Sequence, residues 1–211
     1  MKKLCAAFAV IMTIATVLLL WSCGSEIKNV SERRSGYFTA GDDVFTLTAV
    51  SGERENPFAA DGKAGPLMPY TLITVVPSEF DVDAIITYSA KTASSGYGGT
   101  MTVHPFAASF SAELDAELIG AFTVTVTVGG VAHEYEMKSS VTPDMISFSE
   151  AVGIAEDRLE PVGAYEVRGR LIKNPLDGDG LCWHIAFIFG AEKEHSVLLD
   201  PVTGKVLAKK N

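Results

Sequence analysis

Alternating apolar and polar residues dominate the middle of the chain and predict β-strands. The clearest case is residues 122–137, where valine alternates with threonine up to Gly129-Gly130 and a second alternating segment follows. Alternation with a period of two on both sides of a glycine pair is typical of a β-hairpin whose turn needs positive φ angles. Other strand-like segments precede the hairpin, at residues 44–50, 70–76, 82–89, 100–104 and 106–114.

These short strands predict one domain over residues 37–141. We expect an antiparallel β-sandwich of immunoglobulin-like type, because short strands separated by turn residues and lacking helical periodicity are typical of that architecture. The Cys…Trp…Cys pattern of true immunoglobulins is absent, so only the architecture is expected. In the last strand of the series, alternate residues are expected to share one face: Phe106, Ala108, Phe110, Ala112 and Leu114.

The spacing of apolar residues changes after Thr142-Pro143 and predicts one helix. Ser147 and Glu150 have the spacing of a capping box, in which the serine side chain and the glutamate side chain satisfy each other's backbone amides. Apolar residues then recur on one helical face, and Pro161 ends the helix. Strand patterns follow at residues 165–172, 181–189, 196–199 and 205–208. Residues 142–211 are therefore predicted to form a second domain, and the whole chain is expected to be α+β and mostly β.

The segment 147–211 resembles a PepSY domain. Two alanines, Ala151 and Ala155, lie in the predicted helix. An Asp-Gly hairpin at residues 177–180 precedes a strand with a central tryptophan, Trp183. The segment ends with a V-x-x-D-x-x-T-G-K-V run at residues 197–206. The resemblance implies one helix packed across an antiparallel sheet. PepSY domains in other proteins are associated with restraining peptidases or with sensing at the cell surface, so the resemblance also implies a binding or regulatory role.

The first residues of the chain have the pattern of a secretion signal. Met1-Lys2-Lys3 is positively charged, and residues 4–21 carry no charge. The sequence Leu20-Trp21-Ser22-Cys23 resembles a bacterial lipobox. In lipoproteins with that motif, the signal is removed before the cysteine and a diacylglycerol is attached to its thiol.

The lipobox resemblance implies a membrane anchor. It predicts a signal peptide over residues 1–22, lipidation of Cys23, a polar tether over residues 23–36, and a position on the extracytoplasmic face of a bacterial cell membrane. The alternative is that the signal is not cleaved and forms a transmembrane helix. Such a helix needs about 20 apolar residues, and the uncharged residues 4–21 lie at the short limit of that length.

Composition and charge narrow the classes of partner. The chain is 47% hydrophobic, which is typical of a globular protein. Its net charge is −9, and no run of lysine or arginine is longer than two residues, so a nucleic-acid partner is not expected. With the signal removed and Cys23 acylated, Cys182 is the one remaining thiol, and the core alone must stabilise the fold.

No catalytic, cofactor or metal site is predicted. Cys182 and His184 share one face of a strand, where an imidazole can activate a thiol, but no third orienting group accompanies them. Residues 177–180 resemble part of a calcium loop yet lack the downstream glutamate, and residues 96–99 are glycine-rich but do not open a helix. We interpret the first as a hairpin turn and the second as a loop. The four histidines show no spacing typical of metal ligands: His104, His133, His184 and His195.

The aromatic residues of the second domain have two interpretations. They could form a binding surface, since aromatic residues dominate interfaces, or the core beneath the helix. We favour the core, because alternate residues of segment 181–189 form one large apolar face. The residues concerned are Tyr165, Trp183, Phe187 and Phe189.

Together these patterns favour a non-enzymatic, lipid-anchored envelope protein that binds a peptide or a peptidase. An exposed sheet edge or face would receive the peptide, with main-chain hydrogen bonds supplying affinity. Two alternatives stay open: a structural or adhesive spacer at the surface, and a lipoprotein that binds a small ligand or a metal.

Overall fold

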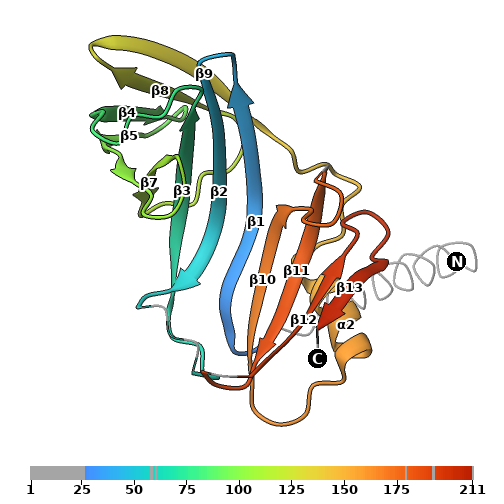
Figure 1. Ribbon diagram of the computed structural model, residues 1–211. Helices are drawn as coiled ribbons and strands as arrows, with labels where there is room; N and C mark the ends of the chain where they lie inside the picture. The colour runs from blue at the N-terminus through green and yellow to red at the C-terminus, as the bar shows by residue number, and fades with distance from the viewer. Residues whose placement is uncertain (1–26, 58, 60, 179, 192, 211) are drawn as a thin grey trace, which may run out of the picture.

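The computed structural model describes residues 27–57, 59, 61–178, 180–191 and 193–210. Over these residues the chain is mostly β, with thirteen strands and one helix (Figure 1). The expected α+β, mostly β class is confirmed, whereas the immunoglobulin-like and PepSY assignments stay predictions. The signal peptide and Cys23 lie outside the described residues. No helix in the described part of the chain is long and apolar enough to cross a membrane.

The first half of the chain forms two facing layers of strands. β2, β3, β7 and β6 continue from β1 in one layer, and β9, β8, β4 and β5 form the other. β9 also pairs with β1, through Phe38 and Ser139, so the layers join along one side. The bounds are β1 (Val30–Gly41), β2 (Phe45–Glu55), β3 (Leu67–Pro77), β4 (Ile86–Lys91), β5 (Gly96–Thr100), β6 (Thr102–Val103), β7 (Phe110–Leu114), β8 (Phe122–Val128) and β9 (Val131–Ser139).

The hairpin over residues 122–137 is confirmed, and two neighbouring predictions are wrong. β8 and β9 pair in register, and Gly129 and Gly130 have φ angles of 56° and 81°. The strand predicted from Phe106 begins only at Phe110, and Phe106 is 93% exposed. Residues 96–99, predicted as a loop, belong to β5, because β4 supplies backbone partners that the glycines themselves do not indicate.

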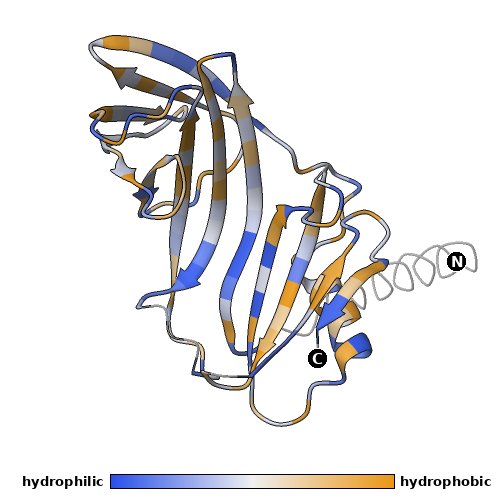
Figure 2. Cartoon of the chain, in the orientation of Figure 1, coloured by the Kyte–Doolittle hydropathy of each residue, from blue (hydrophilic) through white to orange (hydrophobic). Residues whose placement is uncertain are grey.

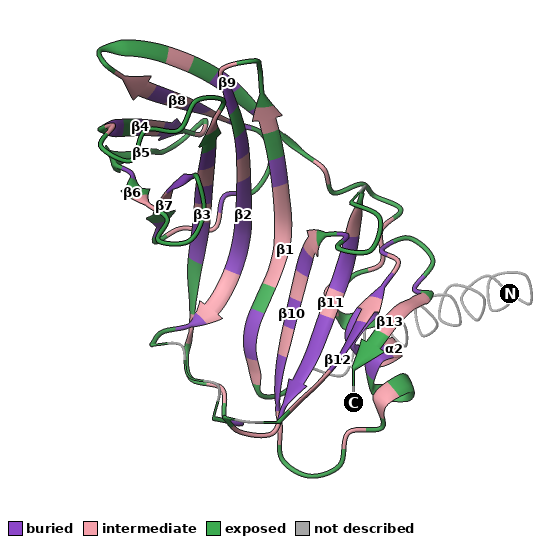
Figure 3. Ribbon diagram, viewed as in Figure 1, coloured by how far each residue is buried: buried purple, intermediate pink, exposed green. Residues whose placement is uncertain are grey.

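The second half places one helix on a four-stranded antiparallel sheet. The elements are α2 (Phe148–Leu159), β10 (Glu166–Lys173), β11 (Leu181–Ile188), β12 (Glu194–Leu199) and β13 (Val206–Lys210). α2 lies across one face of the sheet, against β11 and β12. Figure 3 shows β11 buried over most of its length. Trp183 and Phe187 are buried in the core beneath the helix, and Tyr165 and Phe189 pack at its margin, so their interpretation as core residues is confirmed.

Local signals fix both ends of α2. The Ser147 hydroxyl accepts a hydrogen bond from the Glu150 amide at 3.2 Å, and the Glu150 carboxylate accepts one from the Ser147 amide at 2.8 Å. Glu160 takes a left-handed conformation at the C-terminus, directly before Pro161. The predicted capping box and helix end are therefore confirmed.

β1 joins the two halves into one continuous sheet. Its position also shows that part of the predicted tether is a strand. It begins at Val30, inside the segment 23–36 that we expected to be a polar tether, and it pairs antiparallel with β2 and parallel with β10. The tether prediction is wrong for residues 30–36, because ion pairs with neighbouring strands stabilise charged residues that show no apolar alternation. Figure 2 shows hydrophilic residues in the lower part of β1 and along the neighbouring β10.

Candidate functional site

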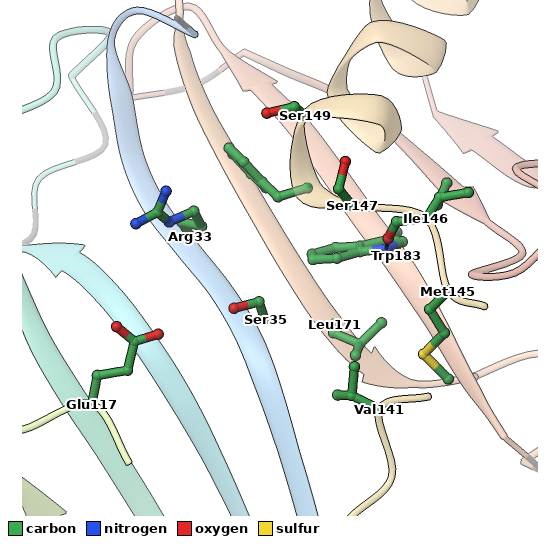
Figure 4. A pocket seen from close by; sticks show the side chains of 11 residues that line it. Arg33, Ser35, Glu117, Val141, Met145, Ile146, Ser147, Ser149, Leu171 and Trp183 are labelled. Atoms are coloured by element: carbon green, nitrogen blue, oxygen red, sulfur yellow. Dashed lines mark hydrogen bonds between the residues drawn. The ribbon is translucent and has the colours of Figure 1, made fainter. Parts of the chain in front are cut away.

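A cleft of about 410 Å³ lies where the sandwich meets the helix-bearing half (Figure 4). Its walls come from β1, from the segment between β7 and β8, from the segment that leads out of β9 into the start of α2, and from β10 and β11. The lining residues are Arg33, Ser35, Glu117, Val141, Met145, Ile146, Ser147, Phe148, Ser149, Leu171 and Trp183.

The floor of the cleft is aromatic and aliphatic. Trp183 and Leu171 are buried, and Figure 4 shows Trp183 at the centre of the cleft between Leu171 and the start of α2. The Trp183 indole N–H donates to the carbonyl oxygen of Ile146 at 3.1 Å, which holds the ring in place. The ring of Phe148 lies 6.2 Å from that of Trp183.

Gly169 on β10 makes room for the Phe148 ring. A Cβ atom at this position would lie 2.2 Å from Cε2 of Phe148 and 3.1 Å from Cδ1 of Ile185. The floor therefore depends on a glycine whose role has no local sequence signal, because the ring that occupies the space comes from the helix.

The rim of the cleft is polar. Arg33 and Ser35 extend from β1, and Ser147 and Ser149 stand at the first turn of α2. The Arg33 guanidinium forms an ion pair with Glu53 at 2.5 Å. An apolar floor with a few hydrogen-bonding groups above it is typical of ligand-binding sites. Such a site suits a ligand in which an apolar group is attached to a polar backbone.

The helix start beside the cleft already has a carboxylate partner. Hydrogen bonds from the backbone amide of Ser147 and then from its side chain lower the pKa of Glu150. Its carboxylate therefore stays ionised at the N-terminal end of α2. This carboxylate occupies the position where an external anion would interact with the helix. The cleft is therefore better suited to a neutral or apolar group than to an anion.

Cys182 and His184 lie on the face of β11 opposite to the cleft. Adjacent strand residues alternate between faces, and Trp183 between them points into the cleft. Burial, with a smaller contribution from the charge of Asp177, raises the pKa of Cys182 to about 11, and burial lowers the pKa of His184. At neutral pH the thiol is protonated, and a protonated thiol is a poor nucleophile.

The other histidines contact aromatic rings. The centroid of the His133 ring lies 5.3 Å from that of the Phe45 ring, and the centroid of the His195 ring lies 5.1 Å from that of the Phe189 ring. The ring of His104 lies edge-on to the ring of Phe106, with the two centroids 6.4 Å apart. Among the residues that the structure describes, no group of three or more histidine, cysteine, aspartate or glutamate side chains could hold a metal ion.

Sequence reasoning missed the residues of the cleft wall. Arg33 and Ser35 fall in the predicted tether. The sequence allows two interpretations of Trp183, as part of a binding surface or of the core, and favours the core. The capping box placed Ser147 at a helix start, but nothing local indicated that this helix start would face β1. Comparisons of the chain with protein-family models, with curated proteins and with solved structures found no match.

Proposed function

We propose that the chain is a lipid-anchored, extracytoplasmic envelope protein that binds an extended peptide segment without catalysis. The cleft above Trp183 would receive one apolar side chain of that segment. The observation that carries the proposal is the combination of an apolar floor and a polar rim in one cleft of about 410 Å³. That volume lies at the small end of the range for ligand sites and suits one large side chain with part of its backbone.

The rim supports an extended backbone as the second part of the ligand. Ser35 and Ser149 bring hydroxyl groups to the cleft from β1 and from α2, whereas the Ser147 hydroxyl is already hydrogen-bonded to Glu150. A peptide that lays one side chain on Trp183 would bring its own amides and carbonyls to this level. Hydrogen bonds there would replace those that the peptide makes with water.

The arrangement of the C-terminal half supports a regulatory role. One helix across a four-stranded antiparallel sheet is the arrangement implied by the PepSY resemblance of residues 147–211. The N-terminal pattern ending at Cys23 supports lipid anchoring, and the partner would then be an envelope protein or a peptidase at the same membrane.

Fluorescence of Trp183 tests the proposal on the full chain in nonionic detergent. The other tryptophan, Trp21, lies in the predicted signal peptide, and Trp21→Phe removes its emission from any chain that keeps the signal, so that the emission reports on the cleft. The probes are blocked tripeptides, alanine-leucine-alanine and alanine-serine-alanine. We expect a saturable shift of Trp183 emission with the leucine peptide and a weaker response to the serine peptide, since an isobutyl group gains about 1.5–3 kcal/mol on burial.

A matched pair of variants separates cleft binding from surface adsorption. Ser35→Phe fills the cleft from its rim and should abolish the response, whereas Ser94→Phe, on an exposed loop, should leave it unchanged. Equal responses to the two peptides, or an unchanged response in Ser35→Phe, would contradict peptide binding at this cleft.

A further inference from the structure

The end of the sandwich farthest from α2 gathers several loops at one place. It is formed by residues 42–44, 78–85 and 104–109 and by the tip of the β8–β9 hairpin, at the upper left of Figure 1. The Ser78 amide donates to the carbonyl oxygen of Val44 at 2.9 Å, and the ring of Phe80 lies 5.5 Å from that of Phe110. We call this end the distal surface.

The distal surface contains a hollow of about 290 Å³ with mainly apolar walls. Phe45, Ile86, Phe110 and Val128 line it, and the segment 77–84 closes one side. The hollow is separate from the cleft above Trp183, with which it shares no lining residue.

Large apolar side chains on the loops of the distal surface are exposed to solvent. Ile85 is 75% exposed and Phe106 is 93% exposed, and Phe80, Val82 and Val131 are also exposed. Single exposed apolar residues are common on protein surfaces, but a group of them beside an apolar hollow is typical of an interaction site. The apolar residues therefore indicate a surface that a partner covers.

The charge of the distal surface indicates what kind of partner fits. Its loops carry five acidic residues and no lysine or arginine: Asp42, Asp43, Glu79, Asp81 and Asp83. Glu79 and Asp81 line the hollow itself. Hydrogen bonds from the amides of Phe45 and Val44 lower the pKa of Asp42, which keeps that carboxylate ionised.

We propose that the distal surface binds a basic polypeptide segment that carries one aromatic or large aliphatic side chain. The side chain enters the hollow, and the flanking lysine or arginine residues lie against Glu79, Asp81 and Asp83. A nucleic acid or an anionic membrane would meet like charges here. A second copy in a two-fold dimer would also place the same acidic loops against each other.

Fluorescence anisotropy on the full chain in nonionic detergent tests this proposal. The labelled probe is the peptide Lys-Gly-Lys-Phe-Lys-Gly-Lys, with one comparison peptide in which serine replaces phenylalanine and one in which glutamate replaces lysine. Measurements use about 0.05 M salt. The Debye length is about 10 Å at 0.1 M salt and longer at 0.05 M, so the charges of the peptide and the protein are screened less. We expect the first peptide to bind most tightly and the glutamate peptide not to bind.

Variants then assign the binding to the distal surface. Phe80→Ser should weaken binding about tenfold, because it removes an exposed aromatic contact, and Asp81→Asn with Asp83→Asn should weaken it about threefold. The matched controls are Val162→Ser and the pair Asp144→Asn with Asp157→Asn, which alter exposed residues elsewhere and should change binding little. Ser35→Phe, which blocks the cleft, should also leave this peptide's binding unchanged.

Three results would overturn the proposal. The first is equal weakening in the distal variants and in their matched controls, which would show attraction to the overall negative charge. The second is equal binding of the phenylalanine and serine peptides. The third is a dimer in sedimentation experiments that Phe80→Ser converts to a monomer, which would identify a second copy as the occupant.

Discussion

Two buried carboxylates on adjacent strands differ in their hydrogen bonding. Glu32 on β1 accepts hydrogen bonds from the Tyr70 hydroxyl and from Nε of Arg170, each at 2.6 Å. Glu166 on β10 is fully buried, and neither of its carboxylate oxygens has a hydrogen-bond partner of ordinary geometry. Burial, and then the charges of Glu55 and Asp61, raise the pKa of Glu166. Glu166 therefore lacks the side-chain partners that Glu32 has.

The raised pKa of Glu166 makes the stability of the protein depend on pH. Below the pKa of the unfolded chain, near 4.5, the carboxyl is protonated in both states and has no effect. As the pH rises above that value, the unfolded chain releases the proton first, so the free energy of unfolding falls until the folded carboxyl also ionises. We expect Glu166→Gln to remove this fall and to stabilise the protein at pH 7 by on the order of 1 kcal/mol.

Urea unfolding at a series of pH values checks the prediction for Glu166. The difference between Glu166→Gln and the unmodified chain should be close to zero at pH 4 and grow towards pH 7, within the interval that the shifted pKa affects. Glu136→Gln, at an exposed position, is the control and should show no such trend. A difference that is constant with pH would show that the carboxyl of Glu166 is not responsible.

At the scale of the elements, two glycines make opposite contributions. Gly169 lies on β10 under the Phe148 ring, and any added Cβ would collide with that ring. Gly153 lies inside α2, where an added Cβ would meet no atom within 4 Å. One glycine allows the helix to pack on the sheet, and the other only lowers the stability of the helix.

Alanine at these two positions should therefore have opposite effects. Gly169→Ala should destabilise the protein by about 1–3 kcal/mol, because it overpacks the contact between α2 and β10. Gly153→Ala should stabilise it by about 0.5–1 kcal/mol, because alanine loses less conformational entropy in a helix. Thermal unfolding followed by circular dichroism measures both changes. Equal changes of the same sign would contradict the packing described for Phe148.

At the scale of the whole molecule, β1 makes the two halves one structural unit. Its first residues pair with β10 and its later residues pair with β9, while β2 pairs along most of its length. Glu32 connects β1 to Tyr70 on β3 and to Arg170 on β10. Burial is the main cause of the raised pKa of Tyr70, which keeps its hydroxyl protonated as a hydrogen-bond donor.

We expect this connection to make unfolding cooperative. The transition seen by Trp183 fluorescence, in a Trp21→Phe background, should coincide with the transition seen by circular dichroism. Arg170→Ala should lower the free energy of unfolding by on the order of 3 kcal/mol, because it leaves the Glu32 carboxylate buried without its cation.

The matched control for Arg170→Ala is Arg33→Ala. The pair of Arg33 with Glu53 is more exposed, with 49% and 30% of the side chains accessible, and its loss should cost less than about 1 kcal/mol. Separate transitions for the two probes, or equal effects of the two arginine variants, would contradict the unit described here.

The sequence alone determined the elements whose signals are local. The β8–β9 hairpin follows from alternation around Gly129-Gly130, and α2 follows from its capping box, its apolar face and Pro161. In each case, residues close together in the chain supply both the pattern and the stabilising contacts. The apolar face of β11 is also visible in the sequence, because one side of the strand is covered by the helix.

Only the tertiary structure decided the start of β1, the edge strand β5 and the cleft above Trp183. Residues 30–36 are charged and polar, and their strand is stabilised by partners such as Arg170, which is 138 positions from Glu32. The glycines of β5 carry no side chains that could indicate a strand, and the backbone of β4 supplies their pairing. A cleft between segments so far apart has no local signal, because its shape depends on contacts that exist only after the chain has folded.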